Sequence, residues 1–339
     1  MTVVFLRYFT KRMLLAAITI FGALTLVFFL THVLPGNPAL VKLGSFADKA
    51  ALEALEKEMG LDKPLVVQYG NYLGQVVQGD LGESWTTGQP VNKDLAQRIP
   101  ATVELAVFSL IIAILVGIPL GVFAALRKGW TDRFLQGVTI LGVSTPVFWL
   151  GLMLIYVFYY KFNLTPPPTG RLDDFTVPPT HVTGLFTVDS LLSGDFIALK
   201  SSLLQLILPG VTLAFVTIAP IAKMARDSMS QVLQADFIQS ARAMGVSVRE
   251  YVIKDALRNA LIPVLTTLGI VLGYLMAGSV LIEMIYSWPG IGIYVWNALL
   301  SNDFNSIQGV VLIISVTYVF INLVVDLLYV LVDPRISLD

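Results

Sequence analysis

Long apolar segments alternate with polar stretches along the 339-residue chain. A helix that crosses a bilayer core needs about 20 consecutive apolar residues, because the segment must satisfy every backbone polar group by itself. Six segments reach that length, at approximately 13–33, 102–126, 134–160, 203–225, 262–282 and 308–332. The pattern predicts an all-α polytopic membrane protein with six transmembrane helices.

A polar but helix-capable stretch separates the fourth and fifth apolar segments. Gly245 follows a predicted helix at 229–244, and glycine readily takes the left-handed conformation that ends helices. Ser247 and Glu250 then form an S-x-x-E capping box for a second helix. The first helix carries one apolar face, made of Met229, Val232, Leu233, Phe237, Ala241 and Met244. This helix-turn-helix is either a docking site or an amphipathic element that lies on lipid.

The basic residues predict the orientation of the chain, because cytoplasmic loops carry an excess of Lys and Arg. The short loop 283–307 contains neither residue, which places it outside. Six crossings then put both termini and the helix-turn-helix in the cytoplasm. The basic residues on that side are Arg7, Lys11, Arg12, Arg127, Lys128, Arg133, Lys223, Arg226, Arg242, Arg249, Lys254, Arg258 and Arg335.

Two external segments are longer than simple loops. Segment 34–100 contains predicted helices at about 47–59 and 64–78, and the first of them ends at Gly60. Segment 161–202 holds two runs of proline with scattered glycines, and we expect it to form an extended, irregular cap.

Composition removes several kinds of site from consideration. Hydrophobic residues make up 56% of the chain and charged residues 13%, which is typical of a membrane protein. A net charge of −1 without a basic run gives no reason to expect nucleic acid. The absence of cysteine excludes disulfides and thiolate metal sites. His32 and His181 have no partner at ligand spacing, so no metal site is predicted.

Few charges fall within the apolar segments. Glu104 and Glu283 lie near external ends of spans, and we expect them at the interface with access to water. Asp326 is expected to pair with a neighbouring helix or with a cation at the inner face. An ion-coupled carrier would need more buried charge than this. Energy for any transport is therefore expected to come from outside the chain.

Small residues and a polar notch mark the spans. G-I-P-L-G at 117–121 and G-I-V-L-G at 269–273 are small-xxx-small pairs, which predict close helix packing. The notch consists of Ser144, Thr145 and Pro146, followed by Phe148 and Trp149. It either lines a pathway or marks the start of a kinked helix.

The helix-turn-helix resembles the coupling loop of ABC importer permeases for dipeptides, oligopeptides and nickel. The general pattern of that loop is E-A-A-x-x-x-G followed nine residues later by I-x-L-P. Here Gln239, Ser240 and Ala241 replace E-A-A, and 255–258 replaces I-x-L-P. The peptide branch departs in this way, with A-R-A-x-G followed by A-L-R-N-x-x-x-P. The residues that fit the branch are Arg242, Ala243, Gly245, Ala256, Leu257, Arg258, Asn259 and Pro263.

Other short motifs extend the resemblance over most of the chain. They are LPGNP at 34–38, GLDKP at 60–64, GDLGES at 79–84, STPVFW at 144–149, SWPGIG at 287–292 and VDPRI at 332–336. The ordered set resembles the dipeptide-permease B type, which carries a sizeable external segment after its first helix. The resemblance divides the chain into 1–33 with the first span, external subdomain 34–100, a five-helix permease core at 101–332 with external loop 161–202 and coupling loop 226–261, and a cytoplasmic tail at 333–339.

The resemblance also implies partners and sites. A permease of this family works in the bacterial inner membrane with a second homologous permease, two cytoplasmic ATPases that bind ATP and Mg, and an external substrate-binding protein. No catalytic residue and no cofactor are expected on this chain. The implied ATPase-coupling residues are Asp236, Ala241, Arg242, Gly245, Arg249, Leu257, Arg258, Asn259 and Pro263. The candidate pathway or gate residues are Ser144, Thr145, Pro146, Phe148, Trp149, Glu283, Trp288, Pro289 and Gly290.

Several functions stay open at this point. Dipeptide or oligopeptide import is the main hypothesis, and nickel or glutathione import by the same family is the alternative. A membrane-embedded enzyme would need clustered intramembrane acids or a nucleophile with a base, which the sequence lacks. An autonomous channel would conduct without any partner.

Overall fold

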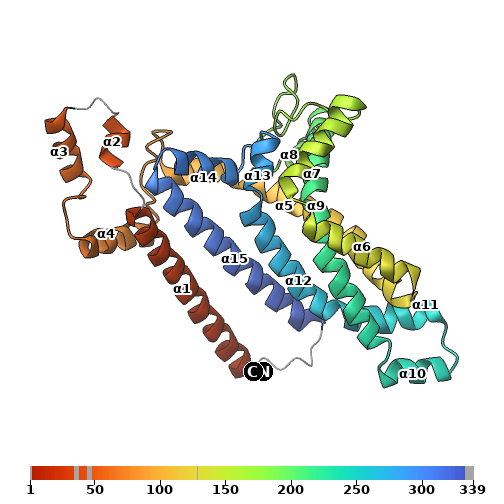
Figure 1. Cartoon of the computed structure of the whole chain (residues 1–339). Helices are drawn as coiled ribbons and strands as arrows, with labels where there is room; N and C mark the ends of the chain where they lie inside the picture. Colours follow the sequence, from red (N-terminus) through yellow and green to blue (C-terminus); the bar gives the residue numbers. More distant parts are fainter. Residues whose placement is uncertain (1, 34–37, 44–47, 128, 333–339) are drawn as a thin grey trace.

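The computed structural model describes residues 2–33, 38–43, 48–127 and 129–332, and every named element in that part of the chain is helical (Figure 1). The first half contains α1 (Thr2–Val33), α2 (Pro38–Leu43), α3 (Lys49–Glu58), α4 (Leu65–Val77), α5 (Val91–Leu126), α6 (Trp130–Ser144), α7 (Val147–Leu154) and the π-helix η1 (Ile155–Lys161). The second half contains α8 (Phe186–Ser193), α9 (Phe196–Val232), α10 (Asp236–Ala243), α11 (Val248–Glu250), the π-helix η2 (Tyr251–Ala256), α12 (Leu257–Gly278), α13 (Val280–Ile285), α14 (Ile291–Leu300) and α15 (Phe304–Val332).

Five of the described helical segments are long and apolar enough to cross a membrane by themselves: Thr10–His32, Val91–Leu126, Phe196–Val232, Val248–Gly278 and Phe304–Leu327. The predicted span 134–160 is a pair of helices, and its two parts are bent by 97°. The described chain thus has six candidate spans if this pair counts as one.

The bend falls at the predicted polar notch. Thr145 leaves helical conformation at φ −82° and ψ 120°, and Pro146 is the N-cap residue of α7, which begins at Val147. Proline has no N–H for the helical ladder, and its ring disfavours helical conformation in the residue before it. The notch is therefore a helix break, which confirms that it marks the start of a kinked helix within span 134–160.

Helices α5 and α9 form the central pair of the molecule. With 36 and 37 residues they each rise about 55 Å, well beyond the roughly 30 Å of a bilayer core. The predicted small-residue pairs lie at helix contacts: Gly117 and Gly121 lie against α9, while Gly269 and Gly273 lie against Val325 and Tyr318 of α15. Close approach at both pairs is confirmed.

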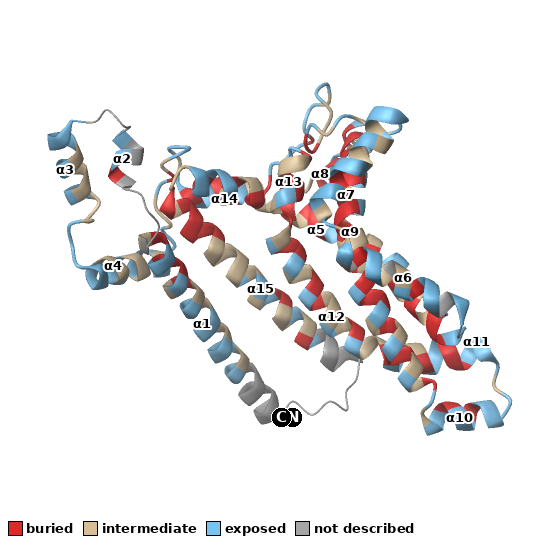
Figure 2. Ribbon diagram, viewed as in Figure 1, coloured by how far each residue is buried: buried red, intermediate tan, exposed pale blue. Residues whose placement is uncertain are grey.

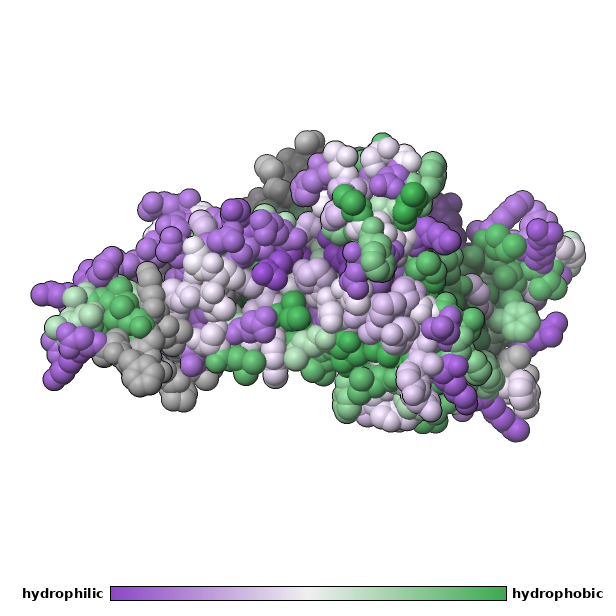
Figure 3. Space-filling view, turned by 90° about the horizontal axis from the view of Figure 1, so that it is seen from above, coloured by the Kyte–Doolittle hydropathy of each residue, from purple (hydrophilic) through white to green (hydrophobic). Residues whose placement is uncertain are grey.

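The remaining elements gather at two ends of the bundle (Figure 1). Helices α10 and α11 lie at the end where α1 begins and α15 finishes. Helices α2–α4, α8, α13 and α14 lie towards the other end, whose surface is largely hydrophilic when seen from above (Figure 3). Six crossings require this arrangement of the ends, whereas the side that faces the cytoplasm stays a prediction.

The long external segments contain more helix than predicted. Helices α3 and α4 confirm the two helices of segment 34–100. Segment 161–202 is irregular only up to Leu185, after which α8 and the start of α9 follow. The loop 283–307 contains α14, whose 10 residues are too few to cross a membrane. The tail 333–339, most of LPGNP and most of VDPRI lie outside the described residues.

Replacement of Gly121 by Ala tests the central helix contact. An added Cβ would meet the carbonyl oxygen of Ala222 and would lie 2.8 Å from Ala225 Cβ and 2.9 Å from Arg226 N. Overpacking of this kind costs about 1–3 kcal/mol. Thermal unfolding in detergent should show this loss for Gly121→Ala. The control is Gly137→Ala, where no atom lies within 4 Å, and equal unfolding temperatures of the two variants would contradict the packing.

Candidate functional site

The predicted coupling loop is built from three short helical elements. Helix α9 ends at Val232, and Leu233 to Ala235 form a turn before α10 begins at Asp236. Backbone bonds of the tighter i→i−3 type close this turn, from Gln234 N to Gln231 O at 3.1 Å and from Ala235 N to Val232 O at 3.0 Å. One continuous helix over 229–244 was therefore wrongly predicted.

The break changes which side chains face inward (Figure 2). A cluster of buried residues joins α5, α9, α10, η2 and α12; it consists of Ala125, Met229, Leu233, Ile238, Ala241, Tyr251, Val252, Ala256 and Ala260. Phe237 and Met244, which were predicted on the same face, are 48% and 77% exposed. The small size of Ala241 is explained by packing within the chain, because the residue is 9% exposed and belongs to this cluster.

Gly245 and Ser247 make the turn between α10 and α11. Gly245 has φ +77°, and no atom lies within 4 Å of the place where a Cβ would stand. Its conformation, rather than crowding, thus selects glycine. The Ser247 hydroxyl accepts from Glu250 N at 3.4 Å, which confirms the serine half of the capping box. The Glu250 carboxylate accepts from Lys254 Nζ at 2.9 Å on the exposed surface.

The other predicted coupling residues lie mostly at the surface. The Arg242 guanidinium carbon is 5.1 Å from the centroid of the Tyr251 ring, which ties α10 to η2. Asn259 donates to the Asp255 carbonyl oxygen at 2.7 Å. Leu257 is half-buried, and the exposed members of the set are Asp236, Arg242, Gly245, Arg249, Arg258, Asn259 and Pro263.

Glu283, a candidate gate residue on α13, lies at the opposite end of the bundle and is 0% exposed. Its carboxylate accepts from the hydroxyls of Thr102 at 2.7 Å and Ser279 at 2.9 Å. It also accepts from the backbone N–H groups of Gly292 at 2.7 Å and Ile293 at 3.1 Å. A water-accessible position was wrongly predicted, because these four donors replace water around the charge.

The SWPGIG motif wraps around this carboxylate. A Cβ on Gly290 would collide with Thr102 Oγ1 and Glu283, and one on Gly292 would lie 2.7 Å from Glu283 Oε2. Trp288 is 0% exposed, and its indole N–H donates to the Ala101 carbonyl oxygen at 2.8 Å. Pro289 is exposed. The motif thus clamps α13 and α14 onto the start of the apolar part of α5.

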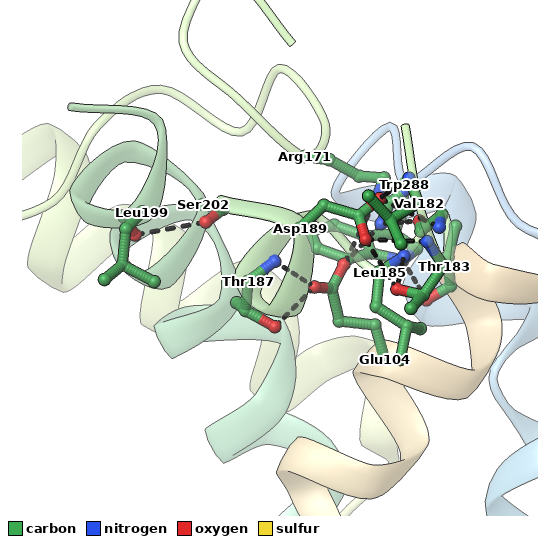
Figure 4. Close-up of polar contacts among 12 residues, drawn as sticks. Glu104, Arg171, Val182, Thr183, Leu185, Thr187, Asp189, Leu199, Ser202 and Trp288 are labelled. Atoms are coloured by element: carbon green, nitrogen blue, oxygen red, sulfur yellow. Dashed lines mark hydrogen bonds and ion pairs between the residues drawn. The ribbon is translucent and has the colours of Figure 1, made fainter. Parts of the chain in front are cut away.

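A second buried carboxylate, Glu104, binds the external loop to α5 (Figure 4). Arg171 Nη2 lies 2.6 Å from Glu104 Oε2, with the two side chains 7% and 4% exposed. The same nitrogen donates to the Gly184 carbonyl oxygen at 2.7 Å, and the guanidinium carbon lies 3.6 Å from the centroid of the Phe186 ring. Thr187 N and Oγ1 both donate to Glu104 Oε1 at 2.7 Å. Glu104 is also wrongly predicted as water-accessible.

The same contacts shift the pKa values of titratable groups in this loop. Burial lowers the pKa of Arg171, and Glu104 opposes that shift. Burial raises the pKa of Asp189, but the hydroxyl and N–H donors around it more than offset this, so that the net shift is downward. Hydroxyl donation from Ser201 lowers the pKa of Asp173, which ties the loop to α9. The Asp173 contact therefore favours the folded loop above the ordinary carboxyl pKa and is lost as pH falls through the lowered value.

Two further buried carboxylates hold the GDLGES motif and the turn that follows it, residues 79–87, on the bundle. Asp303, just before α15, accepts from Ser84 Oγ at 2.6 Å and from Ser306 Oγ at 2.8 Å. Asp94 accepts from Thr87 Oγ1 at 2.6 Å and from Tyr294 Oη at 3.1 Å. The motif thereby joins the external subdomain to α5, α14 and α15.

The notch and the last span complete the predicted set. Ser144, Pro146, Phe148 and Trp149 are exposed and Thr145 is half-exposed. Tyr286 links α7 to the gate segment, because its hydroxyl donates to the Gly151 carbonyl oxygen at 3.1 Å and lies 3.0 Å from Thr212 Oγ1.

Asp326 pairs with Arg12 of α1 at 2.8 Å, which confirms its predicted partnership with a neighbouring helix.

Sequence reasoning missed most of the donors and one of the cations in these networks. Thr102 and Ser279 are single hydroxyls in apolar helices, and Arg171 is one residue in a proline-rich loop. No local pattern distinguishes such residues, since their partners lie far away in the sequence. Among the described residues, no group of three or more His, Asp or Glu side chains is placed to hold a metal ion.

Comparison with known proteins defines the class to which this architecture belongs. Residues 117–338 match the family described as the binding-protein-dependent transport system inner membrane component, and residues 5–106 match its N-terminal membrane component. The chain belongs to this family of permease subunits. It is a multi-pass protein of the inner membrane and a transport subunit that works with an external binding protein and an ATPase.

Individual relatives match almost the whole chain. The probable D,D-dipeptide transport system permease protein DdpB of Escherichia coli is 44% identical over 93% of this chain and 93% of its own length. The dipeptide transport system permease protein DppB of Alkalihalophilus pseudofirmus is 40% identical, with 98% and 99% covered. The glutathione transport system permease protein GsiC of Pectobacterium atrosepticum is 36% identical, also with 98% and 99% covered.

Substitutions at Glu283 test the carboxylate network. Glu283→Leu leaves two backbone N–H groups without an acceptor, and each such buried donor costs about 1–3 kcal/mol. Glu283→Gln should lose less stability, because its amide oxygen can still accept from those N–H groups while the Thr102 and Ser279 hydroxyls reorient. Glu53→Leu on the exposed face of α3 is the control. Equal unfolding midpoints for Glu283→Leu and Glu53→Leu would show that the network does not stabilise the fold.

A double-mutant cycle tests the Arg171–Glu104 pair. Arg171→Met leaves the Glu104 charge buried without its cation, and this kind of loss costs about 3–5 kcal/mol. Adding Glu104→Gln should recover part of that loss, since the neutral amide needs no counter-charge. The stabilities of the two single variants and the double variant are compared by their unfolding midpoints in detergent. A double variant that is as unstable as the sum of the two single losses would contradict the pairing.

Proposed function

We propose that this chain is the permease subunit of an ATP-driven importer for dipeptides or oligopeptides. One observation carries the substrate class: the relatives named as D,D-dipeptide and dipeptide permeases align over 93–98% of the chain. The substrate-binding protein delivers the peptide at the end that carries α8, α13 and α14. A second homologous permease forms the other half of the pathway, and two ATPases bind ATP and Mg on the cytoplasmic side.

The ATPase binds at the end formed by α10 and α11. Phe237 and Met244 present apolar surface there that the chain itself leaves uncovered. Arg249 and Arg258 are exposed nearby in the sequence and offer charge-assisted hydrogen bonds to ATPase carboxylates. We therefore favour docking of a partner over an amphipathic helix that only lies on lipid, because the inner face of α10 already packs in the chain's own cluster.

The buried cluster couples this docking surface to the transmembrane helices. It contains residues of α9, α10, η2 and α12, so that a displacement of α10 moves α9 and α12 with it. Helix α9 is unbroken from Phe196 to Val232, and its far end lies beside the external loop through the Asp173–Ser201 contact. ATP-driven closure of the ATPases would in this way change the external end of the pathway.

The gate lies at that external end. The segment with Glu283, Trp288, Pro289 and Gly290 closes over α5, and the notch residues Ser144 to Trp149 line its approach along α7. Tyr286, which contacts α7 and α9, is the joint between the two segments.

Glutathione is the second candidate substrate, because the glutathione permease GsiC is 36% identical over 98% of this chain. Uptake by proteoliposomes that hold both permeases, the ATPases and the binding protein separates the candidates. Unlabelled dipeptide should inhibit the uptake of labelled dipeptide, whereas unlabelled glutathione or nickel should not. Uptake of glutathione or nickel without peptide uptake would reject the peptide assignment.

Met244→Asp tests the coupling surface in the same complex. The exposed position tolerates a carboxylate in the isolated chain, but the charge removes an apolar contact with the ATPase. We expect unchanged thermal unfolding of the permease, loss of ATPase co-purification and at least tenfold slower uptake, which corresponds to about 1.4 kcal/mol. Ala51→Asp, at an exposed position on α3, is the control for charge alone. Wild-type uptake by the Met244→Asp complex would reject the assignment.

A further inference from the structure

Helix α4 differs from the rest of the external subdomain in its lack of charge. Its 13 residues, LVVQYGNYLGQVV, include no Asp, Glu, Lys or Arg, and none of them is buried. Helix α3 also has no buried residue, but its 10 residues KAALEALEKE carry five charges, as expected for a helix surrounded by water. The composition of α4 therefore needs a different explanation.

One face of α4 packs on α1. The Tyr69 ring centroid lies 5.1 Å from that of Phe28 and 5.8 Å from that of Phe29, and the Tyr72 ring centroid lies 5.5 Å from that of Phe28. Tyr69 also forms a hydrogen bond with Thr25. Because the apolar span of α1 runs to His32, these contacts lie about 4–11 Å inside its outer end.

A second face of α4 is polar and lines a cavity. Gln68, Asn71 and Gln75 recur at helical spacing and border an open cavity of about 710 Å³ against α1, the 79–85 loop and α15. Gln68 Oε1 lies 3.2 Å from His32 Nε2. This face has water and polar partners.

The third face is apolar, and its two ends are left uncovered by the described chain. Val66 and Val77, eleven residues apart and therefore on one side of the helix, are 81% and 87% exposed. Leu73 lies between them on that side and is only partly buried. On α1, Leu26, Phe29 and Leu30 are also exposed, and Phe29 touches α4 through Tyr69. The apolar surface of a membrane-spanning helix thus continues onto α4.

We propose that α4 is an interfacial helix, with Val66, Leu73 and Val77 inserted into the outer leaflet of the bilayer. Three observations favour lipid over a protein: the contacts lie inside the outer end of α1, the surface is continuous with the lipid-facing side of α1, and 13 residues carry no charge. Interfacial helices bury their apolar face about 5–10 Å into the headgroup and acyl-chain boundary. Insertion fixes the height of the external subdomain above the membrane.

Spin labelling tests this proposal directly, because the chain contains no cysteine. Val66→Cys, Val77→Cys, Leu26→Cys and Gln75→Cys are labelled separately in the full chain, assembled with its partner permease and ATPases in phospholipid vesicles. Collision rates are measured with oxygen, which concentrates in the bilayer, and with a water-soluble chromium complex. The ratio of the two rates at Val66 and Val77 should resemble that at Leu26 and exceed that at Gln75 several-fold.

Two results would overturn the proposal. A ratio at Val66 and Val77 equal to that at Gln75 would place the face in water. A low collision rate with both reagents, present from the start or appearing when the external binding protein is added, would show that a protein covers it. Gln75→Cys is the water-exposed reference, since its label should be accessible to the chromium complex in every preparation.

Discussion

The buried carboxylate of Glu283 constrains the end of this permease that carries α13 and α14. A charge in an apolar surrounding is unfavourable by many kcal/mol unless donors replace the water that it loses. Four donors do so here, from α5, from the end of α12 and from the start of α14. These donors must converge within hydrogen-bond distance, which leaves no space for a side chain on Gly290 or Gly292. The two glycines of the SWPGIG motif follow from that geometry.

The two ends of the bundle are held together by different kinds of interaction. At the end that carries α13 and α14, three more buried carboxylates accept hydrogen bonds from hydroxyl groups: those of Glu104, Asp303 and Asp94. Glu104 also accepts from Arg171. Such contacts depend on direction and distance, so they favour a small number of defined arrangements. At the end that carries α10, an apolar cluster joins the elements without directional bonds. A displacement of α10 therefore moves the packed helices together. At the other end, the hydrogen bonds around the carboxylates are either formed or lost.

Much of this architecture could be predicted from the sequence, because the dominant signals are local. Apolar length predicted the spans, and glycine and serine predicted the turn at 245–247. The misses have both local and long-range causes. The apolar face of 229–244 was misplaced because a three-residue turn after Val232 shifts the helical register. Glu104 and Glu283 were placed in contact with water because their donors are up to 181 residues away in sequence. Helix α14 was missed because ten apolar residues fall short of a span.

The coupling loop also separates residues that shape the element from residues free to contact a partner. Ala241 is buried in the chain's own cluster and Gly245 provides a left-handed turn, so the fold of the permease already restricts both positions. Phe237 and Met244 make no such contribution, since they are largely exposed. The motif positions Ala241 and Gly245, by which the loop is recognised, therefore reflect how the loop folds. The choice of ATPase must depend instead on exposed side chains, which can change without disturbing the turn, and their apolar character is unexplained unless something covers them.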